Sequence, residues 1–164
     1  MIVVRPFDRS DLDAVITGLP ARAADMHRRR LEQHERGDGV WFIAWVDGRA
    51  IGFVGVGMHN DRDVDEMLEA RGYALVEDLY VEGAYRRRGA ARALMETLER
   101  VAREAGMPGV ILDTGVDEDF AAARGLYASL GYVDQGGVYL GGWSDPDRPG
   151  VHLVDPLTTW LKSF

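Results

Sequence analysis

Three consecutive arginines precede a glycine at the point where an apolar strand pattern changes into a helical one. Arg86, Arg87, Arg88 and Gly89 follow the run LVEDLYV and open directly into the amphipathic run AARALMETL. The first amides of a helix have no partner inside it, and the helix dipole places partial positive charge there. A glycine lets a ligand approach the backbone, and the arginines add full charges. The stretch therefore predicts a site for a phosphate or diphosphate.

Neither of two well-known phosphate loops accounts for this stretch. The sequence contains no GxxxxGK[ST], which is the pattern of a P-loop, and no GxGxxG, which is the pattern of a dinucleotide-binding turn. An exposed arginine run beside a turn glycine is the alternative interpretation of these residues taken alone.

Two carboxylates lie on the strand that leads into this loop. Glu77 and Asp78 stand among apolar neighbours, where a carboxylate is costly to bury unless it has a use. Successive strand side chains face opposite ways, so we expect only one of the pair to face a given side. Glu77 would share its side with Leu79 and Val81. Both carboxylates could instead be solvated or paired with arginines.

Tyr127 is a further side chain that could move a proton. It lies on the apolar stripe of a later helix, together with Leu126 and Leu130. Its ring can pack in the core while its hydroxyl reaches a cleft, so a packing role and a proton-donating role are compatible.

The elements that must position these residues alternate between strand and helix patterns. The expected order is a strand at Val3 and Val4, a helix capped by Ser10, a helix from Ala21 to Arg36, two strands around the turn Asp47-Gly48, a strand from Tyr73 to Val81, a helix from about Arg88 to Ala105, a strand from Gly109 to Thr114, a helix through Ala123 and Leu130, and a strand from Tyr132. This order is typical of an α+β or mixed α/β sandwich. Arg28, Arg29 and Arg30 of the second helix are expected to form a solvated face rather than an anion site.

Three segments resemble the GNAT acetyltransferase superfamily. Its acetyl-CoA signature is [RQ]-x-x-G-x-[GA], and the segment from Arg86 to Ala91 reads RRRGAA between a strand and a helix. The preceding VEDLYV and the later ARGLYASLGY are similar to two further family motifs at the right separation. The resemblance covers residues 1 to about 135. It implies one domain over 1–164 with the GNAT acyl-CoA N-acyltransferase fold, an α/β (α+β) fold whose mixed six- to seven-stranded sheet is splayed between strands 4 and 5 and flanked by about four helices.

The resemblance also implies acetyl-CoA as the acetyl donor. The diphosphate of acetyl-CoA would lie on the N–H groups of Arg86, Arg87, Arg88, Gly89, Ala90 and Ala91. Its pantetheine arm would pair with main-chain groups beside Leu79, Tyr80 and Val81, like an added strand. Many relatives have an asparagine that helps to bind this arm where the present chain has Phe120. Asp117 or Asp119 could substitute for that contact.

Catalytic roles follow from the same resemblance. Glu77 would be the base or the amine anchor, with Asp78 or a water molecule as the alternative base. Tyr127 would be the general acid that protonates the CoA sulfur. The acceptor pocket would draw on the first two helices, the loop before the fourth strand and the C-terminal hairpin, and so on Trp41, Trp45, His27, the His59–Arg71 loop and Trp143.

The composition of the chain limits which classes of ligand, cellular location and metal site are expected. The net charge of −8 disfavours a duplex nucleic-acid binder and favours small cationic amines. No apolar run is long enough to span a membrane, the N-terminus lacks a signal-peptide pattern, and cytoplasm is the expected location. The four histidines lack metal-site spacing and cysteine is absent, so no metal is expected.

The expected function is N-acetylation of a primary amine of a small molecule through a ternary complex. Acetylation of a protein N-terminus or lysine, and a non-catalytic CoA-binding sensor, are the alternatives. A homodimer is possible by analogy with relatives.

Overall fold

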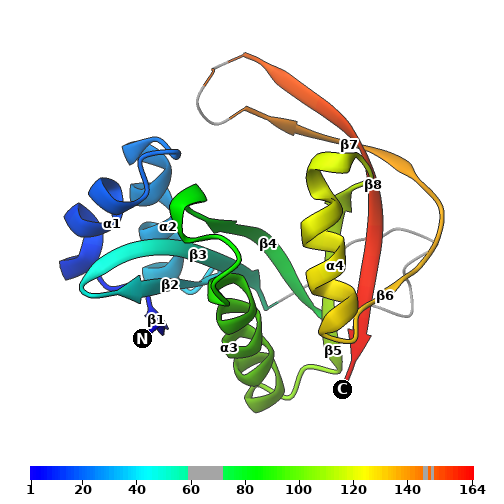
Figure 1. Cartoon of the computed structure of the whole chain (residues 1–164), viewed down its shortest axis with the longest axis horizontal. Helices are drawn as coiled ribbons and strands as arrows, with labels where there is room; N and C mark the ends of the chain where they lie inside the picture. Colours follow the sequence, from blue (N-terminus) through cyan, green and yellow to red (C-terminus); the bar gives the residue numbers. More distant parts are fainter. Residues whose placement is uncertain (59–71, 146–147, 149) are drawn as a thin grey trace.

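One sheet with helices on both faces makes up the described part of the chain (Figure 1). The computed structural model describes residues 1–58, 72–145, 148 and 150–164. The loop His59–Arg71, expected to contribute to the acceptor pocket, lies outside the described residues.

The described residues form eight strands, one more than the upper expectation. Their spatial order is β1-β2-β3-β4-β5-β8-β6, and β7 pairs with β8 off this path. The strands are Val3–Pro6 (β1), Val40–Val46 (β2), Arg49–Gly57 (β3), Ala74–Val81 (β4), Gly109–Gly115 (β5), Val133–Asp134 (β6), Tyr139–Ser144 (β7) and His152–Ser163 (β8). The additional strands come from the Gly-, Pro- and Trp-rich tail, whose β7–β8 hairpin carries no clear strand pattern.

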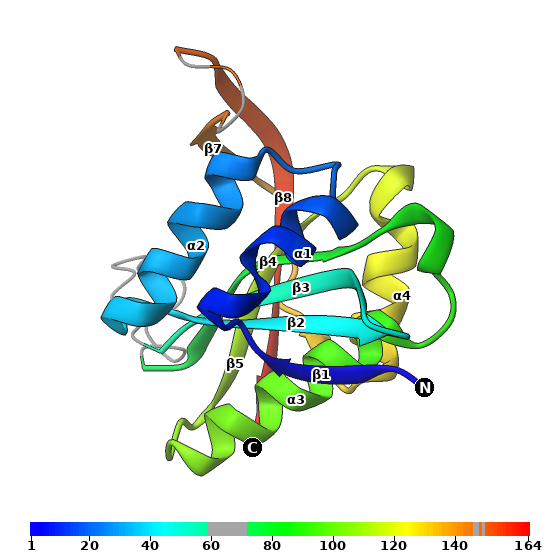
Figure 2. The same cartoon turned by 90° about the vertical axis from the view of Figure 1, so that its left-hand side faces the viewer.

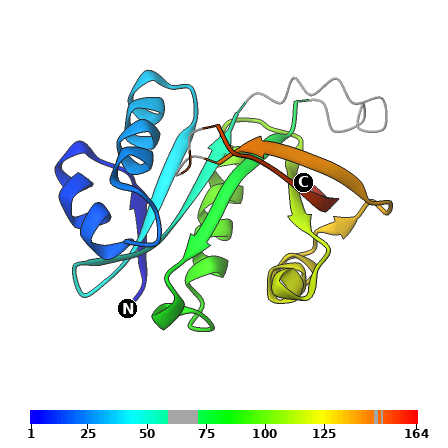
Figure 3. The same cartoon turned by 90° about the horizontal axis from the view of Figure 1, so that it is seen from above.

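The predicted splay between the fourth and fifth strands is confirmed. β4 and β5 are parallel and pair only where Ala74 meets Val110 and Leu75 meets Ile111. Beyond that point the two strands diverge (Figure 3), while β3 continues to pair with β4 on its other side as far as Val81. The β5-side edge of β4 is therefore left without a strand partner over the second part of its length.

Helices cover both faces of the sheet (Figure 2). α1 (Leu12–Gly18) and α2 (Ala24–Arg36) pack over the apolar side chains of β2 and β3 on one face. α3 (Ala90–Glu104) and α4 (Ala121–Ser129) share the core on the other face. Short 3-10 turns lie at Arg9–Asp11, Gly83–Tyr85 and Glu118–Phe120.

Both long helices begin later than the sequence pattern predicts. α2 begins at Ala24 rather than Ala21, and α3 begins at Ala90 rather than Arg88. Gly89 precedes α3 with a φ of 89°, a left-handed conformation that a helix interior does not allow. The arginine loop consequently lies outside the helix and in front of its N-terminus.

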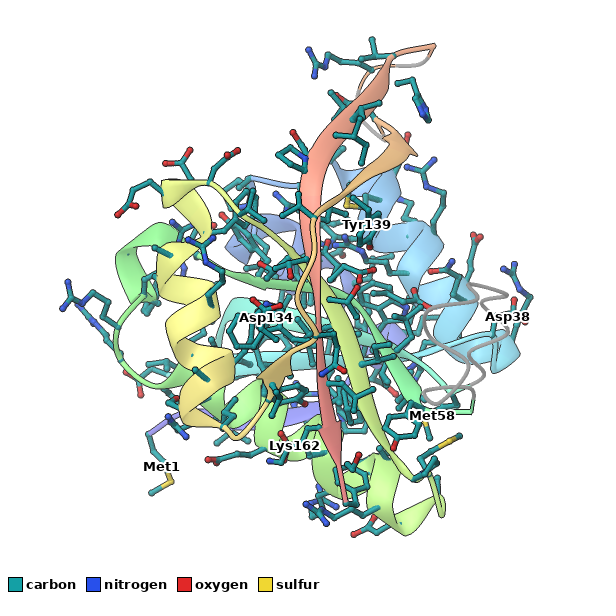
Figure 4. All side chains as sticks on the ribbon, turned by 90° about the vertical axis from the view of Figure 1, so that its right-hand side faces the viewer. Met1, Asp38, Met58, Asp134, Tyr139 and Lys162 are labelled. Atoms are coloured by element: carbon teal, nitrogen blue, oxygen red, sulfur yellow. The ribbon has the colours of Figure 1, made fainter. Side chains whose placement is uncertain are left out.

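The tail forms an edge that reaches beyond the main sheet. β5 pairs with β8 from Leu157 onward, whereas the earlier residues of β8 pair with β7. Figure 4 looks onto this edge, where Asp134, Tyr139 and Lys162 mark β6, β7 and β8.

Candidate active site

A β-bulge at Glu77 changes the direction of the side chains on β4. Gly55 pairs with Asp78, and the next residue of β3, Val56, pairs with Val76, so Glu77 is an extra residue in β4. A bulge of this kind leaves one residue unpaired and interrupts the alternation of the strand.

Contacts on the two faces of the sheet show which way the side chains around this bulge point. Oε1 of Glu77 lies 3.1 Å from where a Cβ on Gly57 would stand. Asp78 accepts a hydrogen bond of 2.5 Å from Nη2 of Arg30, which belongs to α2. Leu79 instead packs into the core shared by α3 and α4. The prediction that Glu77 would share its side with Leu79 is therefore wrong, because the bulge turns both carboxylates toward α1 and α2.

The carboxyl group of Glu77 has a raised pKa. Burial of the group is the main cause; the positive charge of Arg30 partly offsets it, and the neighbouring Asp78 adds to it. The side chain as a whole is exposed, but its carboxyl group rests over Gly39 and Gly57, where no side chain intervenes. A carboxylate with a raised pKa is a stronger base than an ordinary one, which suits proton abstraction from an amine.

Arg30 is buried, which corrects the prediction that it belongs to a solvated face. Its guanidinium lies 4.7 Å from the ring centroid of Trp41 and 4.1 Å from that of Phe53, and it forms the ion pair with Asp78. Burial lowers its pKa to about 10 despite the nearby carboxylates. The physical reason is helical periodicity: Arg30 follows the buried Met26 by four positions, whereas Arg28 and Arg29 are exposed.

Tyr127 lies across the splay from these carboxylates. It is 6% exposed, and its ring packs 6.0 Å from Tyr132 and 6.5 Å from Trp160. Burial raises the pKa of Tyr127 to about 12, and the charge of Asp78 adds to this shift. The hydroxyl is therefore protonated at neutral pH, so packing of the ring and donation of a proton are compatible at this position.

A cavity of about 1160 Å³ lies between β4, β5, α2 and α4. It brings together four of the predicted site residues: Glu77, Leu79, Phe120 and Tyr127. Its other lining side chains include Arg22, Met26, Arg29, Arg30, Gln33, Trp41, Asp78, Asp113 and Asp145. The sequence patterns did not single out Arg22, and the inward turn of Arg30 could have been read from its spacing to Met26.

The arginine loop stands at the far end of β4, beyond this lining. Arg87 and Gly89 both have left-handed backbones, with φ of 61° and 89°, and no heavy atom lies within 4 Å of where a Cβ on Gly89 would stand. The side chain of Arg86 donates from Nε to the carbonyl of Val81 at 3.0 Å, which holds the loop against the strand end. The amides of the first turn of α3, which begins at Ala90, have no acceptor within the helix. An exposed loop with free amides suits a diphosphate.

Phe120 is one of the residues that line the cavity. It ends the 3-10 turn Glu118–Phe120, and its ring occupies the space beside Gly115 at the end of β5, where a Cβ would clash with it. The ring is 42% exposed, so it offers an apolar surface rather than the amide of the asparagine found in many relatives.

Three of the residues expected to line the acceptor pocket separate into two groups. Trp41 contacts the cavity. His27 is buried with its Nε2 3.2 Å from the carbonyl of Leu19, and Trp45 is buried beneath Arg5, so these two are structural. Within the described ranges, no cluster of three or more histidine, cysteine or acidic side chains could hold a metal ion. None of the helices described here is long and apolar enough to cross a membrane.

Comparisons with known proteins agree with this architecture. The family model "Acetyltransferase (GNAT) family" matches residues 11–132. Human N-acetyltransferase 8 is 32% identical over 110 residues, which cover 67% of this chain and 45% of that protein. The chain thus spans less than half the length of this curated relative.

Solved structures resemble the whole fold at lower identity. Ribosomal-protein-alanine N-acetyltransferase from Brucella melitensis has a TM-score of 0.73 with 18% identity, and the match covers 99% of each chain. AAC(6')-Iy in complex with the bisubstrate analogue CoA-S-monomethyl-acetylneamine has a TM-score of 0.70 with 22% identity, covering 85% of this chain and 95% of that one. With its splayed sheet, its glycine-led loop before α3 and a family match over most of its length, the chain belongs to the GNAT acetyltransferase family.

Proposed function

We propose that the protein transfers the acetyl group of acetyl-CoA to a primary amine of a small molecule by direct attack within a ternary complex. The observation that carries the proposal is the edge of β4 that has no strand partner beyond Leu75. This edge leads to the loop before α3, where backbone amides are free, and the cavity beside it contains Glu77 and Tyr127, which could transfer protons. The loop from Arg86 to Ala91 would hold the diphosphate. Main-chain groups beside Leu79, Tyr80 and Val81 would hold the pantetheine arm.

Glu77 is the proposed base. Asp78 is already engaged by Arg30 at 2.5 Å and lies 4.0 Å from Nε of Arg22, whereas the carboxyl group of Glu77 rests over glycines. A carboxylate already held by two guanidinium groups is less available to an amine, which favours Glu77.

Tyr127 is the proposed acid. As the amine nitrogen bonds to the acetyl carbon and the carbon–sulfur bond breaks, Glu77 takes a proton from the amine and Tyr127 gives one to the departing sulfur. The burial of Tyr127 keeps its proton in place until the thiolate, a base, develops beside it.

A thiol assay tests this function. The protein is mixed with acetyl-CoA, a thiol reagent and a panel of small amines, N-terminal peptides and lysine peptides. Release of CoA with small amines is the expected result. Faster release with peptides would transfer the assignment to a protein acceptor, and CoA binding without release for any acceptor would support the sensor.

A further inference from the structure

Three arginines lie on the α2 side of the cleft, in a protein whose net charge is −8. Arg22, Arg29 and Arg30 line the cavity there together with Glu77 and Asp78, and both Arg22 and Arg30 lie beside Asp78. Three guanidinium groups and two carboxylates leave this wall, which we call the arginine wall, with an excess of positive charge.

One of these arginines has an unused donor. The side chain of Arg30 is 9% exposed, and its Nη2 is bonded to Asp78. Its Nη1 is buried and has no hydrogen-bond partner among the described residues. Buried donors nearly always bond to protein, water or a ligand, so a ligand oxygen is one acceptor that this donor can take.

The other two arginines extend the wall toward solvent. Arg22 lies 4.5 Å from the ring centroid of Tyr80 and shares Asp78 with Arg30. Arg29 is exposed, lines the cavity and has no ion pair within the described part of the chain. One carboxylate shared between two guanidiniums neutralises only one of them.

The remaining acidic residues of the cavity, Asp113 and Asp145, lie on the opposite side of the cleft, so the excess of positive charge is local to the α2 side and is not a property of the whole lining. Asp113 accepts a hydrogen bond of 2.8 Å from Thr159, and Asp145 is paired with Arg148 at 2.6 Å. Asp113 belongs to β5 and Asp145 directly follows β7, both on the side of the cleft opposite α2. The donors that contact them, Thr159 and Arg148, lie on that same side.

We infer that the acceptor carries a carboxylate a few bonds from its amine, as an α-amino acid does, and that the arginine wall binds this carboxylate while Glu77 meets the amine. The inference rests on the proposed acetyl transfer and names the substrate class of that site. Guanidinium groups bind carboxylates with paired, charge-assisted hydrogen bonds. Because Arg30 holds Asp78, the residue next to Glu77, the two ends of the acceptor bind close together.

The same wall discriminates against other amines. A polyamine or an aminoglycoside would bring further positive charges toward three arginines, and like charges repel in a cleft of low dielectric. The acidic net charge of the protein attracts such amines from a distance, but the charge at the site decides which of them binds productively.

Matched pairs of acceptors test the inference. Initial rates of CoA release are compared for L-phenylalanine and L-phenylalaninamide, for L-leucine and L-leucinamide, and for spermidine. We expect kcat/KM to favour each acid over its amide at least tenfold. The test is stringent because the amino group of an amino-acid amide is less basic than that of the free acid. More of the amide is therefore in the reactive neutral form, which would favour the amide if the carboxylate had no binding site. Equal rates, faster amides or a preference for spermidine would overturn the carboxylate site and leave acetyl transfer standing.

Substitutions in the arginine wall test whether it causes the preference for acids over amides. Arg29→Gln should reduce the acid-to-amide ratio several-fold, mainly through the KM of the acid, whereas Arg28→Gln is the matched control. Arg28 lies on the same helix and pairs with Asp25 outside the cavity, so its variant should keep the ratio. Arg30→Lys should reduce the ratio further. Arg29→Gln remains informative if the Arg30 variant does not fold, and an unchanged ratio in Arg29→Gln would contradict the assignment.

A binding measurement separates the two proposals. Calorimetry in the presence of CoA compares N-acetyl-L-phenylalanine with its amide, and the acid should bind at least tenfold more tightly. Absence of turnover with every amine would refute the proposed function, while equal affinity of the acid and the amide would refute the arginine wall as a carboxylate site.

Discussion

Replacing Glu77 with glutamine should separate catalysis from stability. The change keeps the size of the side chain and removes the group that accepts the proton. General base catalysis contributes about 10²–10⁴-fold to a reaction rate. We expect kcat/KM to fall by about that factor. In the wild-type protein, activity should rise with pH through the raised pKa of Glu77, because only the deprotonated carboxylate accepts a proton. The variant should lack that rise and should recover part of its rate at high pH.

The same substitution should not weaken the fold. The pKa of Glu77 is raised in the folded protein by burial, so the stability linked to this group is complete at low pH and is lost as pH rises through the folded-state pKa. Glutamine has no charge to desolvate. At pH 8 the variant should therefore unfold at the same temperature as the wild type or slightly above it.

Asp78→Asn is the matched comparison. It removes the acceptor of the ion pair with Arg30, whose side chain is 9% exposed, and leaves a buried guanidinium poorly compensated. A loss of about 1–3 kcal/mol in stability is expected from an unsatisfied buried group. Thermal unfolding and CoA release are measured for both variants. A Glu77→Gln protein with the rate and pH profile of the wild type would refute the assignment of the base, and a large loss of rate in Asp78→Asn alone would transfer that role to Asp78.

Three further substitutions test the donor site and the packing around it. Tyr127→Phe should reduce turnover by about 10²-fold while acetyl-CoA affinity changes little, because the ring still packs and only the proton donor is lost; unchanged turnover in steady-state kinetics would mean that the tyrosine serves packing alone. Gly89→Glu should abolish acetyl-CoA binding in calorimetry, because it places a negative charge at the loop and forces a side chain into a φ of 89°; retained affinity would place the diphosphate elsewhere. Gly55→Ala should cost about 1–3 kcal/mol in chemical denaturation, because its Cβ would lie 2.5 Å from the Trp41 ring; wild-type stability would show that this ring can move freely.

The sequence predicted those turns and helix ends whose conformation is determined by one or two neighbouring residues. The turn Asp47-Gly48 is a hairpin connection with two positive φ angles, 48° and 77°, as that residue pair favours. Gly37 ends α2 in the left-handed conformation, as expected of a glycine after a helix. The loop before α3 was predicted from its arginines and its glycine at the junction of a strand and a helix, whereas the splay followed from the resemblance to a family.

The features that escaped prediction depend on contacts between distant segments. The bulge at Glu77 arises from the register of β4 against β3, which no pattern within β4 reveals. The spacing of Arg30 to Met26 indicates that this side chain turns inward, but the partners that compensate its buried charge are distant: Asp78, 48 positions later in the chain, and two aromatic rings.

The insertion of β8 between β5 and β6 has a consequence for folding order. β6 pairs only with β8 among the described strands, and β5 has two contacts in register with β4 against seven with β8. Chains emerge from the ribosome N-terminus first, and pairings between distant segments form slowly. The β1–β4 half can assemble early, while the half that carries α4 must wait for its central strand to be synthesised, so the two walls of the cleft meet only at the end of folding.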